Sequence, residues 1–281
     1  MNILITGSNG FIGKSLSYYL SNKKDLKIYK DDNSNDLSHW NNWEKFKKCD
    51  VVIHLASKTN SSESNKKSKI YLENNISSAI NGLEYCRKYK AKFIFISSYI
   101  YSRNENLPVS ENSEIDPTNS YSLSKKIIED ICIFYRNKLN VQTLILRPSN
   151  VYGPDLNSKS FIIKILKAVL NDYKFIINSM KIKRDYIYID DLIDGIYKSI
   201  YYRGKYYIFN IGRGESISHE KIVNFINSHK NFKFKINYEN KNLKNKDETL
   251  MNIDLIKKEM NWEPKIDIYR GIEIIIKTLT N

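Results

Sequence analysis

A tyrosine and a lysine four residues apart, Tyr121 and Lys125, could carry out proton transfer if they lie on one helix. Residues at this spacing are neighbours on a helix surface. A nearby ammonium favours the phenolate of a tyrosine, whose pKa is otherwise about 10. The spacing alone is a weak indication, because the chain has 21 Tyr and the same pair recurs beginning at Tyr19 and at Tyr201. The surrounding sequence has to single one pair out.

A serine that could reach Tyr121 lies at the end of a strand-like segment. Residues 91–98 read AKFIFISS, a continuous apolar run of the length of a buried parallel strand. Tyr121 follows Ser98 by about two dozen residues, after a polar loop and at the start of a helical pattern. We therefore expect Ser98, Tyr121 and Lys125 to converge, with Ser97 as the alternative serine.

Three glycines, Gly7, Gly10 and Gly13, lie between an apolar run at 2–7 and a helical pattern at 11–20. The first glycine allows a tight turn, the second lets a pyrophosphate approach the backbone, and the third lets the helix pack on the strand. Amides at the start of the helix then point at the phosphates. The spacing predicts a dinucleotide site that also includes Asn9, Phe11 and Ile12.

Acidic residues follow where the adenosine ribose of a dinucleotide would be held. Asp31, with Asp32 beside it, ends the second strand-like segment and favours NAD over NADP. Lys30 is the competing signal, since it could reach a 2′-phosphate. Asp36, followed by Leu37, is expected to contact the adenine amine or to serve as a helix N-cap or turn aspartate.

The elements around these residues alternate between strand and helix. Apolar runs at 2–7, 26–32, 50–57, 91–98 and 141–154 alternate with helical patterns, the longest at about 71–89 and 121–138. This rhythm predicts an α/β fold with a Rossmann-type, doubly wound parallel sheet. After residue 154 the rhythm changes. We expect a dinucleotide-binding domain at 1–150, joined by about 186–212, and a smaller, mainly substrate-binding lobe at 151–281.

The composition is that of a globular protein, with 41% hydrophobic residues and a formal net charge of +14. The lysines are spread along the chain and accompany abundant Asn, Ile and Tyr, as an AT-rich genome would produce. No nucleic-acid partner is therefore expected. No apolar run is long enough for a membrane helix or resembles a signal peptide. The three Cys and four His show no metal-ligand spacing, so we expect no metal and a cytoplasmic location.

Several motifs together resemble the extended short-chain dehydrogenase/reductases, specifically the nucleotide-sugar epimerase, dehydratase and reductase group. The resemblance covers nearly the whole chain. Its motifs are TGSNGFIG (6–13), HLAS (54–57), FISS (95–98), YSLSK (121–125), LRPSNVYGP (146–154), RDYIYIDDL (184–192), NIGRGESIS (210–218) and NWEPKIDIYRGI (261–272).

The resemblance implies a chemistry for these residues. Tyr121 would act as general acid or base on a sugar oxygen, Lys125 would also hold the nicotinamide ribose, and Ser98 would orient the reacting oxygen. The cofactor would be NAD or NADP and the substrate a nucleotide sugar. Further cofactor contacts would come from Leu55, Ala56, Ser57, Asn75 and Pro148, and substrate contacts from Ser98, Tyr99, Asn150 and Arg184. Alternatives are a surface role for Asn75, a turn role for Asn150 and an Arg184–Asp191 pair.

The sequence departs from the group directly after Ser98, and this departure bears on which reaction we expect. Its 4,6-dehydratases carry Asp-Glu after the catalytic Ser or Thr, whereas Tyr99 and Ile100 follow Ser98 here. We therefore expect no 4,6-dehydratase. The chain is short for the epimerases of this group, and DETLMNID (247–254) lacks the arginine that many of them place before this segment. The resemblance thus favours a 4-keto-sugar reductase, with a 4-epimerase or a catalytically silent cofactor-sensing protein as alternatives. The resemblance also implies a homodimer through the helices at about 71–89 and 121–138.

Overall fold

The computed structural model describes residues 1–31, 35–102, 106–155, 160–170, 176–177, 179–229, 237–238 and 247–280. The chain packs as two compact units. Unit 1 comprises Met1–Glu105, Glu111–Arg147 and Ile193–Phe209, and unit 2 comprises Asn106–Ser110, Pro148–Leu192 and Asn210–Asn281. This division reflects packing alone, so the assignment of residues 1–150 to the cofactor and 151–281 to the substrate stays a prediction.

The largest sheet of the described residues is parallel and has six strands. Its order is β2-β1-β3-β4-β5-β9. The strands are β1 (Asn2–Thr6), β2 (Lys27–Lys30), β3 (Val51–His54), β4 (Lys92–Ile96), β5 (Thr143–Pro148) and β9 (Ile208–Ile211). In this order β2 and β3 lie on opposite sides of β1, so the direction in which strands are added to the sheet reverses at β1. Ligands bind outside the carboxyl ends of the strands at such a switch point.

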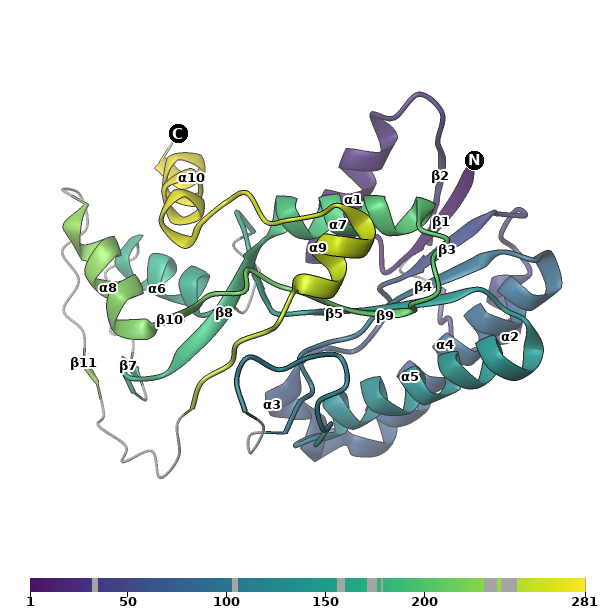
Figure 1. The fold of residues 1–281 in the computed structure, drawn as a ribbon, viewed down its shortest axis with the longest axis horizontal. Coiled ribbons are helices and arrows are strands. Elements are labelled where there is room, and N and C mark those ends of the chain that lie inside the picture. Colours follow the sequence, from purple (N-terminus) through teal and green to yellow (C-terminus); the bar gives the residue numbers. More distant parts are fainter. Residues whose placement is uncertain are drawn as a thin grey trace. The chain divides into compact units, whose positions relative to one another are not determined.

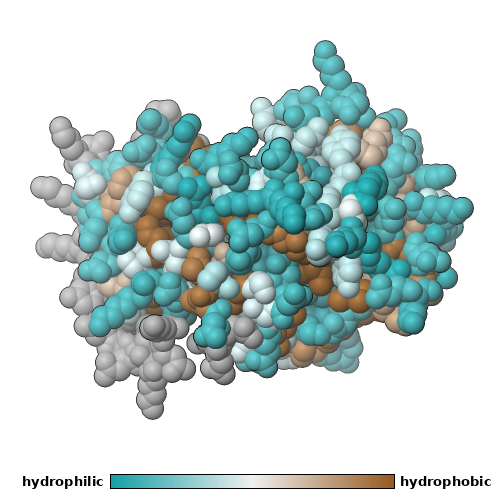
Figure 2. All heavy atoms as spheres, viewed as in Figure 1, coloured by the Kyte–Doolittle hydropathy of each residue, from teal (hydrophilic) through white to brown (hydrophobic). Residues whose placement is uncertain are grey.

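Helices cover both faces of this sheet (Figure 1). α1 (Phe11–Ser21) and α7 (Ile189–Tyr201) lie on one face, and α4 (Ser68–Tyr89) and α5 (Ser120–Leu139) lie on the other. Shorter helices are α2 (Trp40–Trp43), α3 (Ser61–Ser64) and η1 (Asn65–Lys67). The predicted Rossmann-type α/β fold is confirmed. Apolar side chains also remain at the surface where α5 lies (Figure 2), including Phe134, which is 54% exposed.

Unit 2 contains a three-stranded sheet in the order β10-β8-β6. Its strands are β6 (Asn150–Tyr152), β8 (Lys183–Tyr188) and β10 (Ser216–Ser218), and β7 (Ile176–Ile177) pairs separately with β11 (Asn237–Tyr238). Its helices are α6 (Phe161–Leu170), α8 (His219–Ser228), α9 (Asp254–Met260) and α10 (Ile268–Thr280). The buried Asp185 carboxylate on β8 holds the turn before β10 by accepting the N–H groups of Arg213 at 2.8 Å and Gly214 at 3.0 Å.

Candidate active site

The glycine turn has the geometry that the sequence predicts. Gly7 has a φ of +71°, which favours glycine. A Cβ on Gly13 would lie 2.2 Å from the Gly7 carbonyl oxygen, so only glycine lets α1 pack this closely on the turn. A Cβ on Gly10 would instead meet only that oxygen, at 3.3 Å, and otherwise enter open space.

The start of α1 suits an anionic group. Gly10 is the N-cap residue, and no side-chain hydrogen bond caps the helix there. The first-turn amides belong to Phe11, Ile12 and Gly13, while Asn9 is exposed beside them. Uncapped amides at a helix N-terminus attract phosphate. The open space at Gly10 and this helix end together fit a dinucleotide diphosphate.

Asp31 fastens the end of β2 to the glycine turn. Its two carboxylate oxygens accept the N–H of Gly7 at 2.8 Å and of Ser8 at 2.9 Å. A carboxylate has about four lone-pair sites, so it keeps capacity for ribose hydroxyls. The neighbouring Lys30 is exposed, and Asp32 lies outside the described residues.

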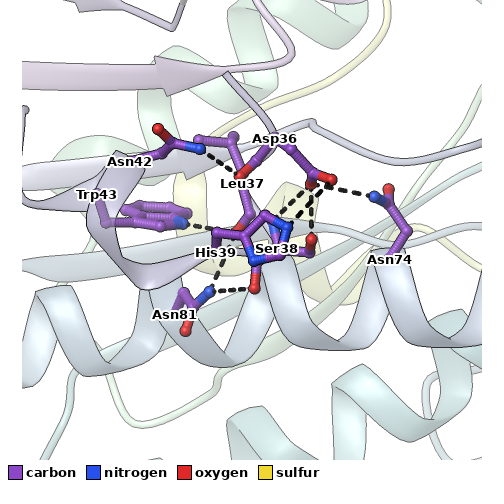
Figure 3. Close-up of polar contacts among 8 residues, drawn as sticks. All are labelled: Asp36, Leu37, Ser38, His39, Asn42, Trp43, Asn74 and Asn81. Carbon is purple, nitrogen blue, oxygen red and sulfur yellow. Dashed lines mark hydrogen bonds and ion pairs between the residues drawn. The ribbon is translucent and has the colours of Figure 1, made fainter. Parts of the chain in front are cut away.

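Asp36 begins a turn that is fastened to α4 (Figure 3). Its carboxylate accepts the N–H of Ser38 at 2.9 Å, the Ser38 hydroxyl at 2.7 Å and the Asn74 side-chain amide at 3.3 Å. Hydrogen bonds from Ser38 lower the pKa of Asp36. The carbonyl of the buried Leu37 accepts Trp43 Nε1 at 2.9 Å. The turn role is therefore observed, and contact with adenine stays a prediction.

The segment after β3 presents a further polar group. The Leu55 N–H donates to the Thr6 carbonyl at 3.0 Å, which keeps Leu55 and Ala56 beside the glycine turn. The Ser57 hydroxyl is buried and has no hydrogen-bond partner among the described residues. A buried hydroxyl in this state is costly unless a ligand or water completes it. It therefore fits the predicted cofactor contact.

Asn75 is buried, in contrast to the surface role considered from the sequence. Its Oδ1 accepts the Lys58 N–H at 2.8 Å, and its Nδ2 donates to the Ser124 hydroxyl at 3.0 Å. The Ser124 hydroxyl in turn donates to the Tyr121 carbonyl at 2.7 Å. Asn75 thus connects the segment after β3 to the first turn of α5.

Unit 1 brings the three predicted catalytic side chains together. The hydroxyls of Ser98 and Tyr121 share a hydrogen bond. The Lys125 Nζ lies 5.7 Å from the centre of the Tyr121 ring and donates to the Ile96 carbonyl at 2.9 Å. Between the two serines, it is Ser98 that reaches Tyr121, whereas the Ser97 hydroxyl has no partner among the described residues. The phenol, ammonium and hydroxyl form one cluster.

The first turn of α5 holds Tyr121 in place through local hydrogen bonds. Asn119 caps the helix by accepting the Ser122 N–H at 2.9 Å, and the Ser122 hydroxyl accepts the Asn119 N–H at 3.1 Å. Asn65 Oδ1 accepts the Ser120 N–H at 2.8 Å. These anchoring residues were missed from the sequence, although N-S-Y-S has the spacing of a capping box.

Burial shifts the titration of the cluster. It raises the pKa of Tyr121, and the Ser98 hydrogen bond works in the opposite direction. Burial lowers the pKa of Lys125 to about 7, against the charge of Glu129 one turn further along. Burial, followed by the charge of Lys125, lowers the pKa of His54 to about 3. Of these three groups, Lys125 is the one whose pKa moves toward neutral pH, the range used for proton transfer.

The remaining predicted residues belong to unit 2, or to the loop beyond β4. Asn150 Nδ2 donates to the Asp185 carbonyl at 2.9 Å. Arg184 forms an ion pair with Asp247, whereas Asp191 accepts the N–H groups of Lys265 and Ile266. Tyr99 is half-buried against Tyr101, and Pro148 is buried at the end of β5. Their roles toward cofactor or substrate stay predictions.

The described residues contain neither a metal-binding cluster nor a membrane-spanning helix. No group of three His, Cys, Asp or Glu there could hold a metal ion. No described helix combines the length and the apolar character needed to cross a membrane. Cys49, Cys86 and Cys132 are buried thiols without disulfides.

Comparison with known proteins identifies the family. The model of the NAD dependent epimerase/dehydratase family matches residues 3–212. A dTDP-4-dehydro-6-deoxyglucose reductase from Escherichia coli is 32% identical, over 99% of this chain and 97% of the relative. A UDP-glucuronate 4-epimerase from Thermodesulfobacterium geofontis is 28% identical, over 96% and 93%. The crystal structure of UDP-glucose 4-epimerase from Thermotoga maritima with UDP-glucose has a TM-score of 0.91, at 22% identity and 100% coverage of both chains.

The chain therefore belongs to the NAD dependent epimerase/dehydratase family. This confirms the resemblance stated from the motifs. The cofactor is NAD or NADP, and the class is that of NAD-dependent enzymes that modify nucleotide sugars. The particular reaction is a separate question.

Proposed function

We propose that the chain acts at carbon 4 of a nucleotide sugar, first of all as a reductase of a 4-keto-6-deoxyhexose carried on a nucleoside diphosphate. The observation that carries the proposal is the Ser98–Tyr121 hydrogen bond with the Lys125 ammonium beside it. Similarity over 99% of the chain to a reductase of a 4-keto-6-deoxy sugar supports reduction.

The chain's own residues divide the work. The glycine turn, the start of α1, Asp31 and Ser57 hold the cofactor, and when bound the cofactor supplies the hydride. Tyr121 donates its proton to the oxygen on carbon 4 as the ketone becomes an alcohol. The positive charge of Lys125 stabilises the phenolate that remains. The hydroxyl of Ser98 orients the same oxygen.

The two side chains that follow Ser98 do not support water elimination. A 4,6-dehydratase needs a proton donor and acceptor after the serine, but Tyr99 packs on Tyr101 and Ile100 is buried. Neither side chain carries a carboxyl group. The choice lies between reduction and epimerization at carbon 4.

The alternative function is an NDP-hexose 4-epimerase, which the same three side chains would serve. A 4-epimerase among the relatives, at 28% identity over 96% of the chain, favours it. An alternative of another class is a catalytically silent dinucleotide-sensing protein. The hydrogen-bonded Ser98–Tyr121 pair speaks against that alternative.

For the substrate, we assign diphosphate contacts to Asn150 and Arg184. The Arg184 fork suits phosphate. Its pairing with Asp247 keeps the guanidinium in a defined position until an anion shares it.

We also propose a homodimer through α4 and α5. An apolar groove on these helices is lined by Ile80, Ile127, Asp130, Ile131, Phe134 and Tyr135. Exposed apolar surface of this kind is typical of an interface.

The test of function is incubation with a dTDP-4-keto-6-deoxyhexose and NADH or NADPH, followed at the nicotinamide absorbance band. We expect stoichiometric cofactor oxidation. Interconversion of UDP-hexoses without net oxidation would support the epimerase instead. Tyr121→Phe should reduce turnover by about 10²–10⁴-fold. Tyr201→Phe is the matched control, because Tyr201 begins another Tyr/Lys pair and should leave turnover unchanged.

A further inference from the structure

Unit 1 contains a buried ion pair that begins one helical turn beyond Lys125. Glu129 on α5 and Arg147 on β5 have side chains that are 1% and 2% exposed. Arg147 Nε lies 3.0 Å from Glu129 Oε1, and Arg147 Nη2 lies 2.6 Å from Oε2. Burying such a pair is expensive, and it adds little stability compared with apolar side chains of similar size. Its position therefore calls for another explanation.

We propose that Glu129 and Arg147 are positioning residues that keep the Lys125 ammonium charged and hold the loop beyond β4 against α5. The proposal deepens the proposed function, since it concerns the group that supports Tyr121. Neither residue is assigned to contact substrate or cofactor.

The spacing along α5 supports the first role. Tyr121, Lys125 and Glu129 follow one another at intervals of four, so their side chains lie on one helix face. The described groups that face Lys125 are Tyr121, Glu129 and Cys132 from α5, His54 from β3, and the Ile96 carbonyl and Phe95 ring from β4. Glu129 is the carboxylate in this set, and burial alone disfavours the ammonium.

The remaining nitrogen of the Arg147 guanidinium, Nη1, supports the second role, which is to hold the loop beyond β4. Arg147 Nη1 donates to the Tyr101 hydroxyl at 2.7 Å and to the Glu111 carbonyl at 3.0 Å. Tyr101 follows Ser98 by three residues and packs against Tyr99. One guanidinium therefore compensates the charge of Glu129 and fixes the loop that begins with Ser98.

The decisive experiment follows the Cε chemical shifts of labelled lysines by NMR as the pH is changed. The Lys125 signal is assigned by its loss in Lys125→Met. Because burial lowers the pKa of Lys125 to about 7, its titration is separated from that of ordinary lysines. In Glu129→Gln we expect the midpoint to fall by about one pH unit, since a neighbouring negative charge is gone. In Glu129→Asp the midpoint should stay close to that of the wild type.

Lys92 provides an internal control in the same spectra. Burial also lowers its pKa to about 7, but its Nζ donates to the Ser199 and Tyr202 carbonyls instead. The Lys92 midpoint should not move in any Glu129 variant. If Glu129→Gln does not fold, Glu129→Gln combined with Arg147→Met removes both charges, and the Lys125 midpoint should still fall. An unchanged midpoint would overturn the proposal.

The readout does not depend on turnover. A lowered Lys125 midpoint in a protein that turns over no nucleotide sugar would leave this proposal standing and would reject the proposed function. In an active protein, the alkaline limb of kcat/KM should move down with the Lys125 midpoint. A uniform loss of rate with an unmoved limb would indicate a structural role only and would contradict the proposal.

Discussion

At the scale of residues, the site depends on basic side chains that are kept out of water. Lys125 and His54 are both buried, and the charge of Lys125 disfavours a proton on His54. Thr6 Oγ1 lies 2.9 Å from His54 Nδ1, and His54 Nε2 has no partner among the described residues. A neutral His54 therefore leaves the positive charge at Lys125, where the proton-transfer chemistry needs it.

The buried His54 should make folding stability depend on pH. Its pKa is lowered to about 3 in the folded protein from an ordinary value of 6.5. Between these values the unfolded chain binds a proton that the folded chain does not, so stability should fall as the pH falls. The loss should be about 1.4 kcal/mol per pH unit.

Urea unfolding of wild type and His54→Gln at pH 6.5 and pH 5 measures this effect. Because other groups titrate similarly in both proteins, the difference between the two losses isolates His54. We expect the wild type to lose about 2 kcal/mol more than the variant over this interval. Equal losses would show that His54 is not held neutral.

At the scale of elements, the glycine turn and α1 make one anion-binding unit. Gly13 is required by packing, since a Cβ would meet the Gly7 carbonyl oxygen at 2.2 Å. Gly10 is less constrained by packing, since a Cβ there would meet only the Gly7 carbonyl oxygen, at 3.3 Å, and this oxygen need move by only a few tenths of an ångström. Substitutions at these two glycines can therefore distinguish the stability of the turn from its affinity for the dinucleotide.

Alanine at each of these glycines should give different results. Gly10→Ala should lose less stability than Gly13→Ala but bind NADH about tenfold more weakly, because the methyl group occupies the space of the diphosphate. Gly13→Ala should be destabilised as well, because backbone must move. Thermal unfolding and nicotinamide fluorescence titration measure the two effects. Unchanged NADH affinity in Gly10→Ala would contradict the placement of the diphosphate.

Elements and local motifs were predictable because their signals are local. The strand and helix pattern, the glycine turn and the Tyr121–Lys125 spacing each lie within a short window. Anchors between distant segments were not predictable. Asn65 accepts the N–H of Ser120 at the start of α5 across a separation of 55 residues, Asp31 reaches Ser8 across 23, and Arg147 reaches Glu129 across 18. Composition and periodicity do not indicate such pairs.

At the scale of the whole molecule, the chain matches its family along most of its length. The family model spans residues 3–212, and the full-length relatives include both a reductase and a 4-epimerase. One set of side chains can serve either reaction, so the fold leaves the reaction open. The proposed assembly is likewise a property of the whole molecule.

The dimer proposal predicts that a charge on α5 disrupts association. Phe134 lines the groove on α4 and α5, and Phe134→Glu should convert a dimer to a monomer because a carboxylate would be buried at the interface. Light scattering after size-exclusion chromatography measures the mass. Tyr18→Glu is the matched control, because Tyr18 on α1 is 76% exposed and lies outside the groove. A monomeric wild type, or a dimeric Phe134→Glu, would contradict this interface.

Isotope transfer to carbon 4 tests the proposed hydride transfer to the sugar directly. The protein is incubated with a dTDP-4-keto-6-deoxyhexose and a reduced nicotinamide cofactor carrying deuterium at the transferable position, and the released sugar is examined by NMR. We expect one deuterium at carbon 4 for each cofactor oxidised, and turnover lower by about 10²–10⁴-fold in Tyr121→Phe. Cofactor oxidation with no deuterium in the sugar, or with deuterium at another carbon, would contradict the proposed transfer.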